Sequence, residues 1–202
     1  MKKLFILCCL LSFGMAGLNQ LSAQGVGEFS YQVSFPTGSF KDFVGKTSFV
    51  GFSGMGRGYL KNEQLSIGGS FSWFYFPDKK GKQTVELGDD GGVYTGNLSN
   101  YTNIYGLLAI VQYDFKKRKE PVVPFVRAGI GGAYQNQRQD IGLYAFQSDG
   151  VQFMMNGEVG VRLNYGYNGL VIAATYHSLP AAGDIKATSF FGLKLGFSSS
   201  KY

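Results

Sequence analysis

His177 is the only histidine of the chain, and Ser178 follows it directly, so this pair is the one candidate for a serine nucleophile with its base. Such a pair needs the two side chains within hydrogen-bond reach of each other. The two residues end an alternating segment typical of a β-strand, in which neighbouring side chains point to opposite faces. We therefore predict that His177 lies in a loop at the rim of the fold, and that the protein is not an enzyme.

Four charged residues share the polar side of alternating segments: Arg127, Glu158, Arg162 and Lys194. A charge that is buried without a partner is costly. We expect Glu158 to pair with one or more of the three cations inside the fold. The network either fills the interior as a structural element, which we predict, or selects or gates ions.

Other motifs predict no metal site and no cofactor. The two adjacent aspartates of Gly88-Asp89-Asp90-Gly91-Gly92 do not supply the spaced oxygen ligands that calcium needs. A phosphate-binding loop is followed by a helix. Gly129-Ile130-Gly131-Gly132 instead lies within a strand pattern and has no helix after it. Lys116-Lys117-Arg118-Lys119 indicates a solvated turn.

The composition excludes several classes of protein. The chain has 202 residues, of which 45% are hydrophobic, 16% aromatic and 16% charged. Charged residues make up about 25% of ordinary soluble domains, and disordered chains have few aromatic residues. Beyond the N-terminus there is no run of 18 apolar residues, which argues against a helical membrane protein. The formal net charge of +6 is modest and scattered, so we predict no nucleic-acid partner.

Residues 1–24 have the pattern of a secretory signal peptide. Two lysines open the segment, a mostly apolar run extends from Leu4 to Leu18, and small residues lead to the cleavage site at Ala23 or Gln24. An N-terminal anchor helix is the alternative. Both cysteines of the chain lie in this segment, so residues 25–202 form a domain without disulfides.

The rest of the chain alternates apolar and polar residues with a period of two, which predicts β-strands. In the last strand, for example, Phe191, Leu193, Leu195 and Phe197 alternate with glycines, a lysine and a serine. Eight strands are expected, near residues 29–35, 48–60, 65–75, 101–115, 123–135, 153–165, 170–177 and 191–197.

Long and short connections alternate between these strands. The long ones are Pro36 to Lys46, Pro77 to Asn100, Asn136 to Gly150 and Ser178 to Ala187. In an antiparallel meander all four then lie at one end, with the short turns and both termini at the other. This predicts an all-β fold: an eight-stranded antiparallel up-and-down β-barrel, closed because unpaired edges are costly in lipid.

The polar side of the strands indicates which face meets water. It carries mainly Ser, Gly, Asn and Gln, which fit the narrow interior of an eight-stranded barrel, whereas a soluble barrel needs a charged exterior. Aromatic residues at strand ends, such as Trp73, Tyr75 and Phe76 at one rim and Tyr113 and Phe115 at the other, are typical of membrane interfaces. We predict a transmembrane barrel. The alternative is a secreted or periplasmic, lipocalin-like barrel that binds a ligand inside.

With its signal peptide, its alternating connections and the aromatic-ended strand Phe190 to Phe197, the chain resembles the small eight-stranded outer-membrane β-barrel proteins, the opacity-protein and OmpX/OmpW-like group. The Ser-Ala-Gln end of the leader is similar to that of Bacteroidetes members. The resemblance covers residues 25–202 and includes no catalytic motif. It implies a location in the cell outer membrane.

The resemblance also implies a function and partners. The function is non-enzymatic, either membrane-structural or surface-binding through the long loops, with Pro77 to Asn100 as the expected recognition surface and a narrow pore as a variant. The expected partners are outer-membrane lipid, a ligand of the loops, and the barrel-assembly machinery. That machinery is thought to read a terminal aromatic residue, here Phe197 or Tyr202.

A lipid-modifying enzyme is the third hypothesis. Some outer-membrane barrels are lipid A deacylases, whose His and Ser are separated by one residue on the same strand face and whose Ser is followed by Asn. Here His177 and Ser178 are adjacent and Leu179 follows, so the chain departs from that pattern.

Overall fold

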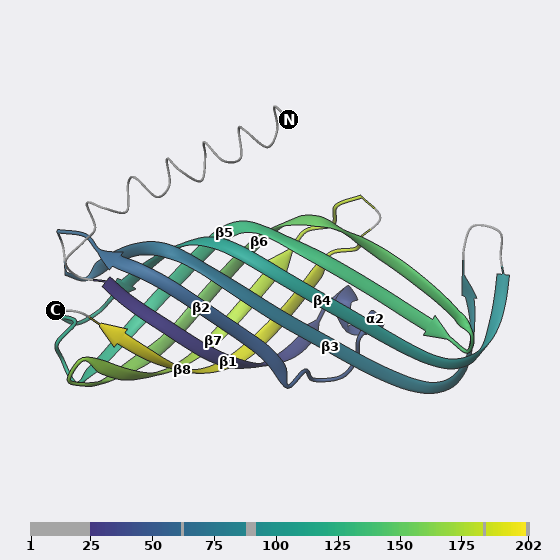
Figure 1. Cartoon of the computed structure of the whole chain (residues 1–202), viewed down its shortest axis with the longest axis horizontal. Helices are drawn as coiled ribbons and strands as arrows, with labels where there is room; N and C mark the ends of the chain where they lie inside the picture. Colours follow the sequence, from purple (N-terminus) through teal and green to yellow (C-terminus); the bar gives the residue numbers. More distant parts are fainter. Residues whose placement is uncertain (1–24, 62, 88–91, 184, 201–202) are drawn as a thin grey trace, which may run out of the picture.

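The computed structural model describes residues 25–61, 63–87, 92–183 and 185–200 as a β-barrel with one short helix (Figure 1). The elements are β1 (Gly25–Thr37), α2 (Ser39–Phe43), β2 (Val50–Tyr59), β3 (Leu65–Leu87), β4 (Gly92–Asp114), β5 (Val122–Ile141), β6 (Tyr144–Tyr165), β7 (Asn168–Leu179) and β8 (Thr188–Ser200). Among the described residues, no helix is long and apolar enough to cross a bilayer.

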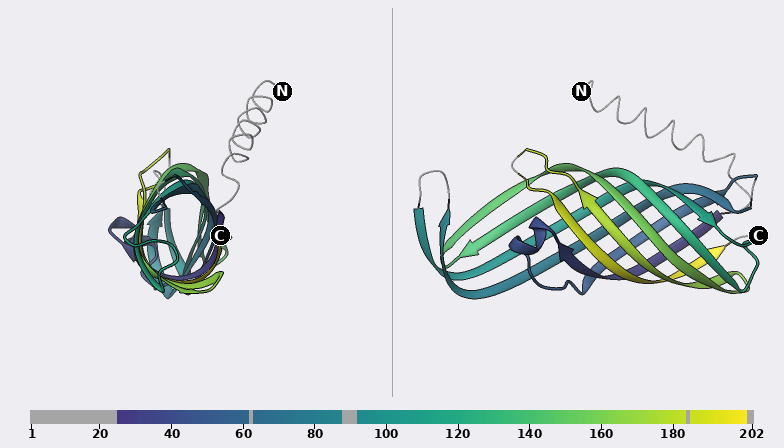
Figure 2. Two further views of the ribbon diagram at one scale, coloured as in Figure 1. Left: turned by 90° about the vertical axis from the view of Figure 1, so that its left-hand side faces the viewer. Right: turned by 180° about the vertical axis from the view of Figure 1, so that it is seen from behind.

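Every strand pairs antiparallel with its neighbour in sequence, and β8 closes the ring on β1 with Phe191 opposite Phe35. The end-on view in Figure 2 shows the closed ring. The predicted fold class, an eight-stranded up-and-down barrel, is confirmed. The predicted signal peptide at residues 1–24, the aspartates of the predicted loop tip (Asp89 and Asp90) and the terminal Tyr202 lie outside the described residues.

Short turns connect β2 to β3, β4 to β5 and β6 to β7 at the end where β1 begins and β8 ends, which we call the turn end (Figure 1). At the opposite end, the loop end, the prediction was wrong for two of the four long loops. β3 and β4 stay paired as far as Leu87 and Gly92, and β5 and β6 as far as Ile141 and Tyr144. The segments predicted as the loops 77–100 and 136–150 are therefore mostly strand.

The two hairpins form a four-stranded sheet that protrudes from the loop end, and we call it the protruding sheet (Figure 1). It was not recognised because its residues do not alternate between apolar and polar. Alternation arises where one strand face meets lipid and the other the barrel interior. A sheet with polar groups on both faces lacks that signal.

Within the barrel the predicted faces hold. The apolar face of β8, formed by every second residue and including Phe191, Leu193 and Phe197, is exposed on the outside of the barrel. Lys194, on the other face, is buried inside. Exposed aromatic and aliphatic side chains form a belt around the outside, as the lipid-facing surface of a membrane barrel requires. Phe76 is an exception. It was predicted to lie in the interface girdle, but it lies on the same face of β3 as Phe74 and points into the barrel.

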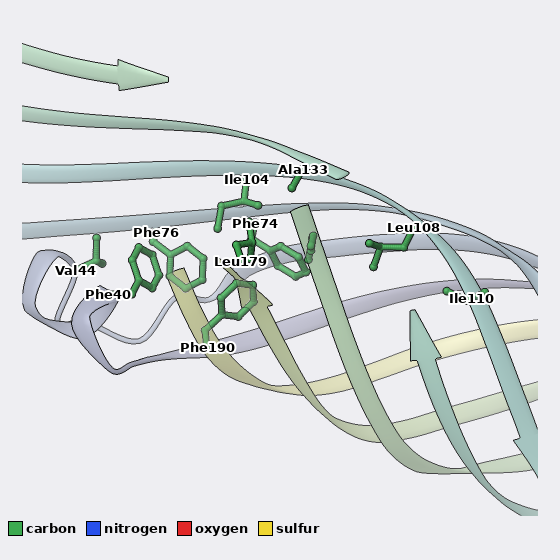
Figure 3. Packing of buried hydrophobic residues seen from close by; sticks show 11 residues of the cluster. Phe40, Val44, Phe74, Phe76, Ile104, Leu108, Ile110, Ala133, Leu179 and Phe190 are labelled. Atoms are coloured by element: carbon green, nitrogen blue, oxygen red, sulfur yellow. The ribbon is translucent and has the colours of Figure 1, made fainter. Parts of the chain in front are cut away.

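The loop end of the interior is filled by an apolar cluster (Figure 3). Helix α2 folds into the barrel mouth and inserts Phe40, whose ring contacts that of Phe76 edge-on at 5.0 Å. Phe190 from β8 contacts Phe74 at 5.0 Å and Phe76 at 5.1 Å between ring centroids. Strands from both sides of the barrel and the helix thus meet in one packed cluster.

Candidate functional site: the barrel interior and the protruding sheet

The middle of the interior holds a ring of two cations and two carboxylates. Arg127 Nη1 lies 2.7 Å from Glu158 Oε1, and Lys194 Nζ lies 2.8 Å from Glu158 Oε2. Glu28 is the second carboxylate, 2.8 Å from Arg127 Nη2 and 3.3 Å from Lys194 Nζ. All four side chains are buried, and their formal charges balance.

Arg162, the fourth residue predicted for this network, lies elsewhere. Its Nη2 is 3.1 Å from Asp114 Oδ2 and donates to the Tyr59 hydroxyl at 3.0 Å. Tyr59 in turn donates to Asp114 at 2.5 Å. Gln112 donates to Asp114 Oδ1 and accepts from Arg127 Nε, so it links this second cluster to the first.

A third feature is an arginine with few partners, Arg57 on β2. Its Nη1 donates to Ser66 at 2.9 Å, but Nε and Nη2 are buried and have no hydrogen-bond partner among the described residues. It packs over the Tyr59 ring at 5.2 Å. Arg118 also lies over this ring, at 5.6 Å, and is only 6% exposed, so the prediction of a solvated turn at residues 116–119 was wrong for Arg118.

Sequence reasoning missed the two carboxylates that complete these clusters, although a signal existed. Glu28 has the parity of Ser30 and Gln32, and Asp114 has that of Gln112, all of which face inward. Period-two alternation alone could have placed both carboxylates inside the barrel. It could not have paired them, because the cross-barrel partners depend on the register of non-adjacent strands.

The prediction that His177 lies in a loop at the rim was wrong, because the residue is buried inside the barrel on β7. Its Nε2 lies 3.2 Å from Thr175 Oγ1, and its ring stacks on Phe190 at 4.6 Å. Ser178 lies on the opposite face of the strand. In the described part of the chain, no carboxylate forms a hydrogen bond with His177, so the acid, base and nucleophile of a hydrolase are not brought together.

The cavity beside His177 has a volume of about 20 Å³, room for roughly one water molecule. It is lined by side chains of both the ionic ring and the apolar cluster, including Glu158, Lys194 and Phe74. In the described chain no group of three His, Cys, Asp or Glu residues could hold a metal ion. The interior is therefore a packed core, the opposite of the ligand chamber that a lipocalin-like barrel needs.

The protruding sheet has two free edges. β2 pairs with β3 only as far as Tyr75, and β7 pairs with β6 only from Met155 onward. Beyond these points no strand of the described residues pairs with the outer edges of β3 and β6. An unpaired edge presents rows of N–H and C=O groups to which another strand can bind.

The two free edges differ in protection. The β3 edge carries Pro77, Lys79, Lys80 and Lys82 and has a register shift between Lys79 and Gly81. Proline, lysine and bulges are the features with which proteins block edge pairing. On β6, the segment Tyr144–Asp149, which we call the β6 edge, contains no proline and no lysine.

The β6 edge is also held in place. Gly142, with φ at 58°, occupies the first central position of the two-residue turn before it, as a type II′ hairpin requires. The Tyr94 ring packs against Tyr144 at 5.0 Å and Phe146 at 5.4 Å. The edge is therefore part of a rigid hairpin rather than a loose loop.

Comparisons with known proteins match the fold. A scan against protein-family models and a search of curated proteins find no match. Among solved structures, Ail, the attachment invasion locus protein of Yersinia pestis, matches with a TM-score of 0.52 at 15% identity, over 87% of this chain and 98% of that chain. Neisserial surface protein A matches with a TM-score of 0.51 at 14% identity, over 89% and 96%.

At these identities the likeness concerns the fold, which is that of small eight-stranded outer-membrane barrels. The predicted resemblance is thereby confirmed at the level of the fold. The predicted location, the outer membrane, is where closed barrels with an apolar outer belt occur.

Proposed function

We propose that the protein is a non-enzymatic outer-membrane barrel that displays the protruding sheet and binds an extended polypeptide segment along the β6 edge. The binding mode is strand addition, in which backbone hydrogen bonds supply affinity and alternate side-chain contacts supply specificity. The observation that carries the proposal is the backbone of Tyr144–Asp149, which pairs with no described strand on its outer side and has no proline or lysine, whereas the β3 edge on the opposite side of the sheet carries a proline, lysines and a register shift.

The interior supports a scaffold role. Ionic and apolar clusters fill it and leave about 20 Å³ beside His177, which favours a closed barrel over the narrow-pore variant. Among the described residues no acid contacts the buried His177, and Ser178 lies on the opposite face of the strand; both observations favour a protein without hydrolase activity. Recognition of the β8 strand by the barrel-assembly machinery stays a prediction.

The turn geometry identifies which backbone groups an added strand would use. In a two-residue hairpin the closing pair, Ile141 and Tyr144, is hydrogen-bonded across the hairpin. Every second residue after Tyr144 then points its N–H and C=O away from β5, so the groups of Ala145 and Gln147 face the free edge. Proline at Gln147 removes an edge donor without breaking the β5–β6 ladder.

The test uses the protein in lipid nanodiscs and a library of fluorescent octapeptides with strand-forming sequences. We expect some peptides to bind, and the tightest to lose at least tenfold affinity to the Gln147→Pro variant. The matched control, Gln147→Ala, changes the same side chain but keeps the N–H and should bind as the native protein does. If no peptide binds, or if both variants lose binding equally, strand addition at this edge is wrong.

A further inference from the structure

A hollow of about 570 Å³ lies on the outer surface where the barrel passes into the protruding sheet. It is lined by Lys46, from the connection between α2 and β2, by Tyr75, Pro77 and Lys79 of β3, and by Tyr101 of β4. This hollow, which we call the lysine hollow, is not used by the proposed function. That function depends on the opposite edge of the protruding sheet.

Aromatic residues give the depth of the lysine hollow relative to the membrane. Tyr75 and Tyr101 stack at 6.4 Å, and one step further into the belt Trp73 stacks on Tyr105 at the same distance. Tyrosine and tryptophan collect at the level of the lipid headgroups. The two lysines therefore stand at, or just above, the headgroup region of the leaflet at the loop end.

A buried carboxylate, that of Asp78, positions Lys46 and Lys80. Asp78 accepts a hydrogen bond from the Gly45 N–H at 2.9 Å and lies 3.4 Å from Lys46 Nζ and 3.9 Å from Lys80 Nζ. Lys46 Nζ also donates to the Lys79 carbonyl at 2.6 Å. The Asp78 side chain is only 3% exposed, whereas that of Lys46 is 60% exposed.

The face that meets the surroundings is therefore cationic. The buried carboxylate of Asp78 offsets one of the two charges of Lys46 and Lys80, and Lys79 in the wall of the hollow adds a third positive charge. Ammonium groups at this depth carry N–H donors that match the oxygens of a phosphate group. The apolar belt below, with Trp73 between Phe52 and Tyr105, suits acyl chains attached to that phosphate.

A second hollow provides an internal comparison. It shares Tyr75 and Tyr101, has a volume of about 540 Å³, and lies on the β5 side with Arg138 and Asp140 in its wall. There Arg138 Nε lies 2.7 Å from Asp140 Oδ1, and this hydrogen bond raises the pKa of Arg138. The charges of that pair cancel, so the two hollows have the same rings and similar size but different charge.

We propose that the lysine hollow binds the phosphate headgroup of a membrane lipid in the leaflet that surrounds the loop end. The lysines contact the phosphate, the tyrosine pair forms the floor, and the acyl chains lie along the apolar belt. The neutral hollow beside it has no such preference. A lipid bound at this site stays next to β3, on the side of the protruding sheet away from the β6 edge.

The single tryptophan makes the proposal measurable, because Trp73 lies two residues from Tyr75 on the same face of β3. The purified protein is placed in phosphatidylcholine vesicles that contain a brominated lipid, and quenching of Trp73 fluorescence reports the lipid next to it. Brominated phosphatidic acid, which carries a phosphomonoester, is compared with brominated phosphatidylcholine. Since one lysine near an anionic lipid raises its affinity about fivefold, we expect phosphatidic acid to be preferred at least fivefold.

The Lys46→Gln/Lys79→Gln variant should reduce this preference to below about twofold. Two controls accompany it. The Arg138→Gln/Asp140→Asn variant, which alters the neutral hollow, should keep the native preference, and so should Lys46→Arg/Lys79→Arg, which keeps the charge. Heat-dependent gel migration verifies that each variant is folded.

Three results with the native protein and these variants would overturn the proposal. The native protein could show no preference, the glutamine variant could keep the preference, or the variant of the neutral hollow could lose it equally. A further experiment adds inorganic phosphate to the native protein in the same vesicles, at a concentration below that of the lipid phosphate groups at the membrane surface. Quenching that stays unchanged supports a lipid ligand, whereas displacement shows that free phosphate is the ligand and that the lipid proposal is wrong.

Discussion

The two halves of the barrel interior are filled by different chemistry. The half toward the turn end contains ion pairs, in which Arg127, Glu158 and Glu28 are all buried. The half toward the loop end contains rings, with Phe190 and Phe74 in direct contact (Figure 3). Both halves are closely packed, but they respond differently to mutation. An apolar cluster loses area and gains a cavity, whereas an ionic cluster loses charge balance.

The largest effect is expected in the apolar half. Phe190→Ala removes a fully buried ring that contacts Phe40, Phe74 and Phe76, and it should reduce the free energy of unfolding by about 4 kcal/mol. Urea unfolding in lipid vesicles, followed by Trp73 fluorescence, measures it. The control is Phe191→Ala on the neighbouring residue, whose side chain faces lipid. Equal costs at the two positions would show that Phe190 is not part of a packed core.

In the ionic half, Glu158→Gln leaves Lys194 and Arg127 with Glu28 as their one remaining carboxylate. We expect a loss of about 3 kcal/mol in the same unfolding measurement, since breaking a buried pair exposes an uncompensated charge. The double variant Glu158→Gln/Lys194→Gln removes one charge of each sign. It should lose less than the sum of the two single variants, and strict additivity would contradict the ion pair.

The sequence predicted these halves to different degrees. Period-two alternation places Arg127, Glu158 and Lys194 on the inward parity, and the structure brings them together. It places Arg162 there as well, but the strand register sets Arg162 opposite Val123 and leaves Glu158 opposite Arg127. Pairing across a barrel depends on that register, which alternation does not specify.

The apolar half was harder to predict because it breaks the alternation. Phe74 and Phe76 are large apolar residues at inward positions, where the pattern expects small polar ones. From the sequence, Phe74 is predicted on the polar face of its strand, whereas Phe76 looks like a further member of the lipid-facing girdle. Only α2, which brings Phe40 into the mouth, reveals that this part of the interior excludes water. The free edges of the protruding sheet could not be predicted from the sequence either, because no local pattern marks where β2 and β7 end relative to the neighbouring strands β3 and β6.

One substitution in the ionic half, at Arg57, should not reduce the free energy of unfolding. Arg57 has two buried nitrogen atoms without a hydrogen-bond partner and no carboxylate within salt-bridge distance in the described chain. Arg57→Met keeps the length of the side chain and removes the charge, so we expect it to stabilise the fold by about 1 kcal/mol. The matched control is Arg162→Met, which leaves the buried Asp114 unpaired and should cost about 3 kcal/mol. A large loss at both positions would mean that Arg57 has an anionic partner.

The smallest effect is expected at His177, where the two halves meet. Its ring stacks on Phe190 of the apolar cluster, while Nδ1 is buried and has no hydrogen-bond partner in the part of the chain that the structure describes. His177→Leu extends the apolar half by one residue of similar volume. It loses the contact with Thr175 and removes one orphaned polar atom, so the free energy of unfolding should change by less than about 1 kcal/mol. The same variant tests the enzyme hypothesis, because a hydrolase that uses the only histidine of the chain would lose its activity. Mass spectrometry of envelope lipids from cells that express the native or variant protein should give identical acylation patterns. A difference would show that His177 does chemistry despite its position between two packed clusters.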